Sequence, residues 1–488
     1  MKSSVKEFIA FLKEKKQESI LIFIIYSTSL SSIGLINFPY LDDTARRVEG
    51  IPNFGVHYSR WMSEVAAWFV QGSRRLTDLG LTTFLLSSVI LTLASVIVVY
   101  SLIRKKANIV SFSISLMIGL NPWYMNAVAF RFDNPYMSMS ILFALIPFIF
   151  WRASKLLFFI VSFFGVFLMY NTYQASSGIY LLMVLTLLFI DVLGKQGNVK
   201  VFLQRGSIGL TSFGLATIAY YLQLRILPTV ASYNSRMIQG NPLGQMIENL
   251  RVYFETLWSQ SANIWIYLFV LVVIFFVIRQ LLDSKFSFLS SFFCTISYFT
   301  LSFVASYGIY LFLEQPIAPN APRYIYGFAV WIAIMGIVLS TKWSIKVMNI
   351  SKNIVLLALG YYMVSFVFIF SSMLDTQKDT FIHFSTALGQ DIAQVYQPGK
   401  RIVINRFGYD SPVLSSASIN FPILPHIVPP NGAVWFPNRF WFSQITGLSS
   451  PVAMNPETID FTKELKPTID TFRWQIFEYK KDIFVVVR

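Results

Sequence analysis

Two adjacent carboxylates stand where the first long apolar run of the chain ends. Asp42 and Asp43 close the segment Phe38-Pro39-Tyr40-Leu41-Asp42-Asp43, which follows that run directly. Pro39 favours a helix end or a turn, so the pair is predicted to lie on a loop just outside a membrane. A carboxylate there could act as a general base. The alternative is that both aspartates cap the next short helix and balance the arginines after it, because aspartate is a preferred N-cap residue.

Arginines near the ends of later apolar runs could serve the same chemistry. Transfer of a group from a phosphate-linked donor to a hydroxyl needs one base for the acceptor hydroxyl and cations for the departing phosphate. Arginine suits the second task, because its planar guanidinium binds two phosphate oxygens and remains charged. Arg131 and Arg323 are the candidate phosphate ligands. The alternatives are that Arg131 and Asp133 form a positioning pair and that Arg323 anchors the chain in the membrane interface.

Further residues are candidates for positioning or for contact with substrate. Adjacent side chains point apart on a helix or a strand, so only one of the two aspartates can be the base while the other positions or caps. Glu314 could cap or bind acceptor hydroxyls. The candidates of this class, which lie on the predicted outer side, are Arg46, Asp133, Tyr173, Gln174 and Glu314.

Several familiar motifs are missing from the sequence. It contains no phosphate-binding Walker loop, no glycine-rich dinucleotide turn, no Gly-x-Ser-x-Gly and no His-Glu-x-x-His. A soluble nucleotide-sugar donor is therefore disfavoured, and a donor already in the membrane suits the chain better. The three histidines are too scattered to suggest a metal site. An aspartate pair can bind a divalent cation or work without one, so a metal requirement stays open.

Composition indicates an integral membrane protein. Hydrophobic residues make up 55% of the chain and charged residues only 13%, about half the charged share of a soluble domain. The net charge of +15 does not indicate nucleic acid, because most lysines border apolar runs. The single cysteine, Cys294, lies inside an apolar run, which excludes an intrachain disulfide.

Runs of about 20 apolar residues, the length that spans a bilayer as a helix, predict about eleven transmembrane helices. Lysines gather at alternate ends of these runs and are absent from the opposite loops up to residue 373. This positive-inside pattern places the N-terminus in the cytoplasm and, with an odd number of spans, the C-terminus outside. The runs fall near 19–37, 79–102, 107–124, 135–151, 156–173, 176–194, 207–227, 261–281, 286–313, 324–341 and 353–373.

The chain divides into a membrane domain, 1–373, and a C-terminal domain, 374–488. The second mixes a helix at about 380–396, a strand at 401–405 and a closing strand at 482–487, which predicts a small extracytoplasmic α/β domain. Four outer segments are long enough to build a site, and part of the first, 58–71, has the apolar spacing of an interfacial helix. In the fourth, three prolines exclude helix. These segments are 38–78, 125–134, 228–260 and 314–323.

The order of several short motifs resembles a known family. The motifs are Phe38 to Thr44, Tyr58-Ser59-Arg60-Trp61-Met62, Asn121-Pro122-Trp123 and Arg131-Phe132-Asp133-Asn134-Pro135-Tyr136-Met137-Ser138. Together they resemble the Gtr-type serotype-converting O-antigen glucosyltransferases, whose aspartate pair in the first extracytoplasmic loop is typical of multi-spanning transferases of the GT-C fold. The resemblance extends to about residue 323 and is weak beyond it.

The resemblance implies a specific reaction and setting. It implies a bacterial inner-membrane enzyme that takes glucose from a polyprenyl-phosphate donor and attaches it to O-antigen on the periplasmic side, with Asp42 favoured over Asp43 as the base. It also implies a small flippase and a donor-synthesising glucosyltransferase as partners. The alternatives are a GT-C transferase for another sugar, or a carrier of a lipid-linked sugar. A carrier predicts ionisable residues near the midplane of its spans, and these are not evident.

Overall fold

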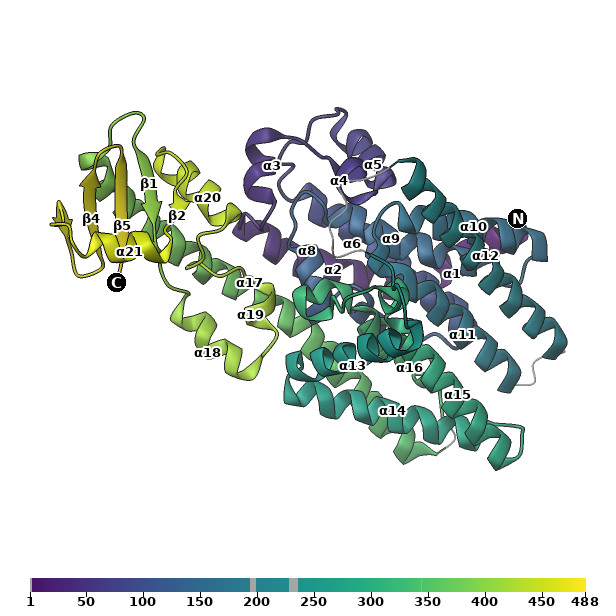
Figure 1. Cartoon of the computed structure of the whole chain (residues 1–488). Coiled ribbons are helices and arrows are strands. Elements are labelled where there is room, and N and C mark those ends of the chain that lie inside the picture. The colour runs from purple at the N-terminus through teal and green to yellow at the C-terminus, as the bar shows by residue number, and fades with distance from the viewer. Residues whose placement is uncertain (1, 194–198, 228–235, 344) are drawn as a thin grey trace.

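The structure is a computed structural model that describes residues 2–193, 199–227, 236–343 and 345–488. Most of it is a bundle of long helices, and a small sheet lies at one end (Figure 1). The N-terminus lies at the far end of the bundle from that sheet, and the C-terminus lies beside the sheet. The predicted fold class, a helical membrane protein with a small C-terminal α/β region, agrees with this arrangement.

Six helices in the described ranges are long and apolar enough to cross a membrane. They are α2 (Lys16–Ile36), α6 (Thr82–Ile103), α11 (Ser177–Leu193), α14 (Asn263–Asp283), α15 (Phe288–Ser306) and α17 (Lys346–Val395). Four shorter apolar segments contain α7 (Ile109–Ser115), α9 (Asn134–Leu145), α10 (Lys155–Tyr170) and α16 (Gly327–Leu339), and α12 (Val199–Ile226) is long but less apolar. Each predicted run thus contains a helix, while the number of spans stays a prediction.

Burial separates central helices from peripheral ones. Nearly every side chain of α16 is buried, and α16 packs against α6, α7, α11, α14 and α15. By contrast, α14 and α15 leave many large apolar side chains on the outside, among them Tyr267, Val270, Phe293 and Leu301. A helix that is apolar all round must be buried in protein or in lipid. The peripheral helices are therefore the ones that lipid is expected to cover.

The outer segments contain more helix than the sequence predicts. The segment after α2 forms α3 (Asp43–Glu49), α4 (Phe54–Tyr58) and α5 (Trp61–Gln71), so the interfacial helix predicted at 58–71 is divided near Ser59. A further helix, α8 (Pro122–Val128), precedes α9, and α13 (Pro242–Gln260) fills most of the third outer segment. In the fourth, two 3-10 turns, Ala318–Asn320 and Pro322–Tyr324, replace the predicted non-helical path. Proline is accepted in the first positions of such turns because they require no proline N–H.

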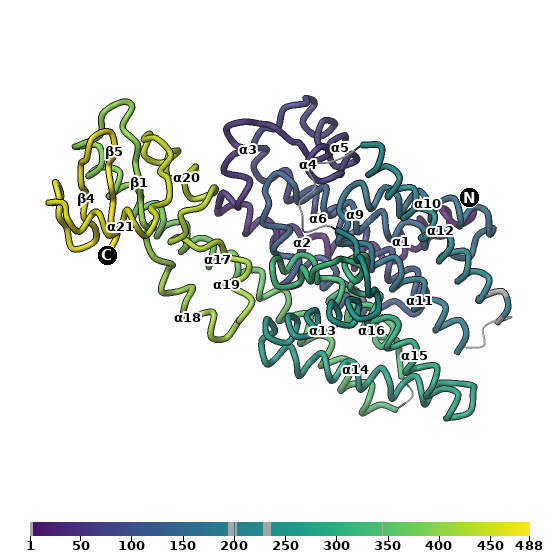
Figure 2. The backbone as a smooth tube through the Cα atoms, in the orientation of Figure 1, coloured from purple at the N-terminus to yellow at the C-terminus, as the bar shows by residue number. Residues whose placement is uncertain are grey.

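A single helix, α17, links the membrane region to the sheet (Figure 2). It runs without interruption from Lys346 to Val395. The apolar run predicted at 353–373 and the helix predicted at 380–396 are therefore parts of one element, and the predicted domain boundary lies inside it. A first helix, α1 (Lys2–Glu14), precedes α2 at the opposite end of the chain.

The C-terminal sheet has five strands in the order β2-β1-β5-β4-β3. The central strands β1 and β5 are parallel, β2 is parallel to β1, and the pairs β4–β5 and β3–β4 are antiparallel. The predicted strands at 401–405 and 482–487 are confirmed as β1 and β5. The elements after α17 are β1 (Arg401–Ile404), α18 (Pro412–Asn420), α19 (Leu424–Ile427), α20 (Phe436–Thr446), β2 (Val452–Ala453), α21 (Pro456–Thr462), β3 (Ile469–Asp470), β4 (Trp474–Tyr479) and β5 (Asp482–Val487).

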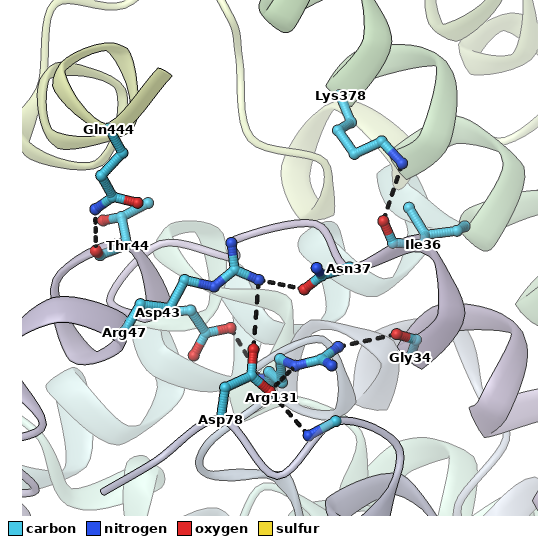
Figure 3. A network of polar contacts seen from close by, with 11 residues as sticks. Gly34, Ile36, Asn37, Asp43, Thr44, Arg47, Asp78, Arg131, Lys378 and Gln444 are labelled. Carbon is cyan, nitrogen blue, oxygen red and sulfur yellow. Dashed lines mark hydrogen bonds and ion pairs between the residues drawn. The ribbon is translucent and has the colours of Figure 1, made fainter. Parts of the chain in front are cut away.

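The C-terminal region docks on the end of α2, on the loop that follows it and on the start of α3. Gln444 of α20 donates to the Thr44 carbonyl at 2.6 Å, and Lys378 of α17 donates to the Ile36 carbonyl at 2.9 Å (Figure 3). The ring of Trp441 lies edge-on to Phe38, with centroids 5.3 Å apart. The loop that holds the aspartate pair is therefore fixed from both sides, by α2 before it and by the C-terminal region above it.

Candidate functional site

Asp42 and Asp43 lie at the start of α3, and neither caps it. Asp42 occupies the N-cap position without a capping hydrogen bond from its side chain. Asp43 instead accepts the backbone N–H of Arg131 at 2.9 Å. Side-chain capping is therefore wrong for both residues, whereas the predicted charge balance is confirmed for Asp42, which lies 3.8 Å from Arg46. The two side chains do point apart, because Asp43 is fully buried while the Asp42 side chain is 42% exposed.

Burial decides the properties of Asp43. Removal from water raises the pKa of its carboxyl to about 7, although the Arg131 N–H and the Arg46 charge oppose the shift. Its Oδ1 has no hydrogen-bond partner among the described residues. A carboxyl with no exposed surface is out of reach of an acceptor hydroxyl. The geometry therefore favours Asp42 as the residue that meets substrate.

Around Asp43 lies a set of ion pairs that we call the paired network: Asp43, Arg46, Arg47, Asp78, Arg131 and Asp133. Arg131 donates from Nε to Asp78 and from Nη1 to the Gly34 carbonyl at 2.9 Å (Figure 3). Arg47 bonds Asn37 and lies 3.7 Å from Asp78. Every arginine of this network faces an aspartate, and Arg47 and Arg131 share Asp78. Arg131, a candidate phosphate ligand, has its guanidinium engaged here.

Arg46 connects this network to Asp42. Its guanidinium forms a buried ion pair with Asp133 and lies 3.8 Å from the Asp42 carboxylate. It also lies over the Phe54 ring, 4.8 Å from the centroid. Burial lowers the pKa of Arg46, and the neighbouring aspartates Asp42 and Asp43 oppose that shift. Asp133 thus pairs with Arg46, and not with Arg131 as the sequence alternative supposes.

Arg323 is in a different environment. It donates from Nη1 to Asn126 Oδ1 at 3.1 Å, and its guanidinium lies over Phe130 and Tyr324, 5.2 and 5.0 Å from the ring centroids. No carboxylate among the described residues pairs with it. Burial alone would lower the pKa of Arg323, but the surrounding phenols reverse the shift and raise it. A permanently charged guanidinium with aromatic neighbours and no acid is a ready anion site.

Arg60, which is not among the site residues predicted from the sequence, is a second arginine of this kind. Its Nε donates to Gln174 Oε1 at 3.3 Å, and its guanidinium lies 4.6 Å from the centroid of Tyr173. Gln174 is held in turn by the Tyr58 carbonyl at 3.1 Å and by Tyr220 Oη at 2.8 Å. In the part of the chain that the structure describes, no acid pairs with Arg60. Tyr173 and Gln174 therefore position an arginine.

Three charged groups act on one phenol. Arg323 donates from Nη2 to the Tyr324 hydroxyl at 3.4 Å and lowers the pKa of Tyr324, while Arg60 acts in the same direction and Asp42 opposes them. Tyr58 extends the link, because its hydroxyl lies 3.4 Å from Asp42 Oδ2 and its ring lies 5.0 Å from Arg60. We call Asp42, Arg60 and Arg323, with Tyr58, Tyr173 and Tyr324, the open group. It carries one negative and two positive charges.

Glu314 lies on a separate strand-like pairing. Its backbone N–H donates to the Arg236 carbonyl at 2.8 Å, next to an isolated bridge between Met237 and Leu313. Asn249 of α13 supports the same segment by donating to the Leu311 and Leu313 carbonyls. Among the described residues, the Glu314 side chain forms no hydrogen bond or ion pair with the open group. Part of the third outer segment, 228–235, lies outside the described residues.

A metal ion has no obvious ligand set here. No cluster of three or more His, Cys, Asp or Glu side chains suited to a metal occurs in the described ranges. The two adjacent aspartates do not converge either, because Asp43 points inwards and Asp42 outwards.

Comparison with protein families identifies a match that covers most of the predicted membrane domain. The model of the family described as glucosyl transferase GtrII matches residues 31–334, well over half of the sequence. The match spans the aspartate pair, both arginines of the open group and all of the paired network. No curated protein matches the sequence.

Proposed function

The chain belongs to the GtrII family of glucosyl transferases, and we propose that it moves glucose from a polyprenyl-phosphate donor to a hydroxyl of O-antigen at the outer face of a membrane. The observation that carries this proposal is the open group. Its two arginines lack acidic partners among the described residues, and an exposed carboxylate stands beside them.

The leaving group of such a donor matches the unpaired cations. A phosphodiester carries one negative charge, and it gains negative charge as the bond to the sugar breaks. Arginines that are already oriented at the site stabilise this developing charge without reorganisation. In the paired network, by contrast, Arg131 already satisfies Asp78. We therefore assign the phosphate contact to Arg323 and Arg60, and we assign Arg131 to positioning.

The reaction is a single displacement at the anomeric carbon. Asp42 takes the proton of the acceptor hydroxyl, and the resulting oxygen attacks the anomeric carbon of glucose. The bond from that carbon to the phosphate oxygen breaks, and polyprenyl phosphate leaves with the electron pair next to Arg323. Asp42 fits the role of base because its side chain is partly exposed and Tyr58 and Arg46 hold it in place.

The apolar helices and the charge pattern support the proposed setting. Lysines at one set of helix ends support a cytoplasmic N-terminus, an extracytoplasmic open group and a C-terminal region on the same outer side. In a bacterium this membrane is the inner one, and the outer face is periplasmic. A donor presented at this face has to be made and moved across the membrane, which supports a donor-synthesising glucosyltransferase and a small flippase as partners.

The test is glucosyl transfer by the purified protein with polyprenyl-phosphate-glucose and an O-antigen acceptor. Asp42→Asn is expected to lower kcat by about 10²–10⁴-fold while donor binding persists. Asp43→Asn, buried and without access to substrate, is the matched comparison and should keep most of the rate. Equal rates for wild type and Asp42→Asn would remove Asp42 from the mechanism. Absence of transfer by wild type with any lipid-linked sugar would favour a carrier.

A further inference from the structure

A chain of hydrogen bonds runs from the C-terminal region to Arg323. Tyr40 Oη lies 2.6 Å from the Ile427 carbonyl oxygen of α19. Asn126 Nδ2 lies 2.5 Å from Tyr40 Oη, and Asn126 Oδ1 lies 3.1 Å from Arg323 Nη1. The backbone N–H of Arg323 also points to Asn126 Oδ1, at 3.4 Å. One buried asparagine thus stands between the docked C-terminal region and an arginine of the open group.

The direction of each bond in this chain is determined by chemistry. A carbonyl oxygen can only accept, so the Tyr40 hydroxyl donates to Ile427. The lone pairs of Tyr40 Oη are then left to accept from the Asn126 amide NH₂. Arginine can only donate, so the amide oxygen of Asn126 faces Arg323. This order requires a side chain with a donor at one end and an acceptor at the other.

The choice of an amide has an electrostatic consequence. Aspartate has nearly the same shape as asparagine, but at position 126 it would pair with Arg323 and cancel its charge. It would also offer Tyr40 an acceptor in place of a donor, in competition with the Ile427 carbonyl. Asparagine binds Arg323 and leaves its positive charge uncompensated. Every arginine of the paired network has an aspartate beside it, so the amide at Arg323 distinguishes the two environments.

Aromatic packing joins the same residues independently of these hydrogen bonds. The Tyr40 ring lies edge-on to Phe130, with centroids 5.0 Å apart, and the Arg323 guanidinium lies 5.2 Å from the centroid of that same Phe130 ring. Tyr40 is fully buried and precedes Asp42 by two residues. Also, α19 packs against α8, the helix that contains Asn126. A shift of α19 would therefore be felt by Tyr40, Asn126 and Arg323 together.

We propose that Asn126 is a positioning residue that orients Arg323 and keeps it free of a carboxylate, and that docking of α19 on Tyr40 couples the C-terminal region to the strength of the donor-phosphate site. The inference rests on the proposed role of Arg323 in binding the donor phosphate. It adds a function for the C-terminal region, which then sets the affinity of a site in the membrane region without contacting the donor.

The test compares two lipids that differ only in the phosphate group, polyprenyl phosphate and the uncharged polyprenol, for binding to the purified full chain in nanodiscs. In Asn126→Asp, the affinity for polyprenyl phosphate is expected to fall about tenfold or more, with polyprenol binding unchanged. Asn320→Asp is the matched control, because it makes the same change on an exposed residue three positions before Arg323. It should bind both lipids as wild type does, since exposed charges are screened.

Tyr40→Phe keeps the ring and removes only the hydroxyl that bonds the Ile427 carbonyl, so it tests the coupling between α19 and Arg323. It also replaces Asn126→Asp as the test if that variant does not fold. Its affinity for polyprenyl phosphate should fall about threefold to tenfold, with KM for the donor rising more than kcat falls. If both variants kept the wild-type affinity for polyprenyl phosphate, or lost affinity equally for both lipids, the inference about Asn126 would be overturned. The proposed donor site would then still stand. A wild-type protein that binds polyprenyl phosphate no better than polyprenol would instead overturn the proposed donor site, and the inference with it.

Discussion

Two groups of arginines lie near each other in the short segments between the long helices, and they differ in what they face. In the paired network, Arg46, Arg47 and Arg131 each have an aspartate partner. In the open group, Arg60 and Arg323 face an amide and aromatic rings. The first arrangement is complete without a ligand and holds the loop around Asp43. The second is left with a surplus of positive charge, which an anionic substrate would balance.

The comparison shows that the partner of an arginine is more informative than its position. Breaking a buried ion pair leaves an isolated charge and is strongly destabilising, so paired arginines are expected to act on stability. Replacing an arginine that has no acidic partner leaves no isolated charge behind, so it should cost the fold little stability. Such a substitution is expected to affect substrate binding and reaction rate instead. The following predictions use this difference, from the largest expected effect to the smallest.

Asp133→Ala should give the largest loss of stability. The side chains of Asp133 and Arg46 are both about nine-tenths buried, so removing one leaves the other charge without its main partner. We expect the free energy of unfolding to fall by about 3–5 kcal/mol, measured by denaturation in detergent. Asp460→Ala removes one member of an exposed pair with Lys463 and should change stability by less than about 0.5 kcal/mol. Similar losses in the two variants would contradict the distinction.

Asp43 should make stability depend on pH. Its pKa is about 7 in the folded protein and about 4 in an unfolded chain. Between these values the unfolded state loses the proton and the folded state keeps it, so stability falls as pH rises, by at most about 4 kcal/mol in total. Asp43→Asn should remove this component and melt at a higher temperature than wild type at pH 8. If the melting temperatures of wild type and Asp43→Asn changed in the same way between pH 4 and 8, Asp43 would not be the source of the pH dependence.

Arg323→Gln should affect catalysis and leave the fold intact. Loss of a charged contact to phosphate is expected to lower kcat/KM for the donor about 100-fold, or about 2.7 kcal/mol. The melting temperature should stay within a few degrees of wild type, because no carboxylate is left behind. Arg323→Lys keeps the charge without the planar fork and should recover part of the loss. A large drop in the melting temperature of Arg323→Gln would show that Arg323, like the arginines of the paired network, mainly stabilises the fold.

Gln444→Ala should give the smallest effect. It removes the hydrogen bond to the Thr44 carbonyl at the edge of the docked C-terminal region, which is expected to cost about 1 kcal/mol. Hydrogen exchange of residues 43–49 should accelerate, because α3 loses a contact from α20. Gln394→Ala, on an exposed part of α17, should leave that exchange unchanged. An equal acceleration in both variants would show that the contact does not hold the loop.

The sequence predicts most of the helical architecture and less of the site. Apolar runs place a helix in every predicted span, and β-branched runs place β1 and β5. The helix α13 was not predicted, although Asn241 followed by Pro242 is a typical N-cap and first-turn pair. The prediction of two separate helices, at 353–373 and at about 380–396, is wrong, because α17 continues without a break between residues 373 and 380.

The roles within the site could not be separated by sequence, for a physical reason. Arg131 and Arg323 both follow apolar runs at the outer side, and only the fold shows that Asp78, 53 residues from Arg131, neutralises the first. Asp42 and Asp43 are equally acidic, and their different burial depends on how α3 packs. Arg60 had a signal, because it lies in one of the motifs that carry the family resemblance, but its apolar neighbours suggested an interfacial helix instead.

Because α17 is unbroken, its number of residues determines how far the C-terminal sheet lies from the helical bundle and how the sheet is rotated about the helix axis. Its 50 residues span about 75 Å at a rise of about 1.5 Å per residue, of which the hydrocarbon core of a bilayer takes about 30 Å. One inserted residue would swing the sheet by about 100° about the helix axis, whereas seven would lift it by about 10 Å and nearly restore its heading. Insertions and deletions in α17 are therefore expected to add or remove whole helical turns.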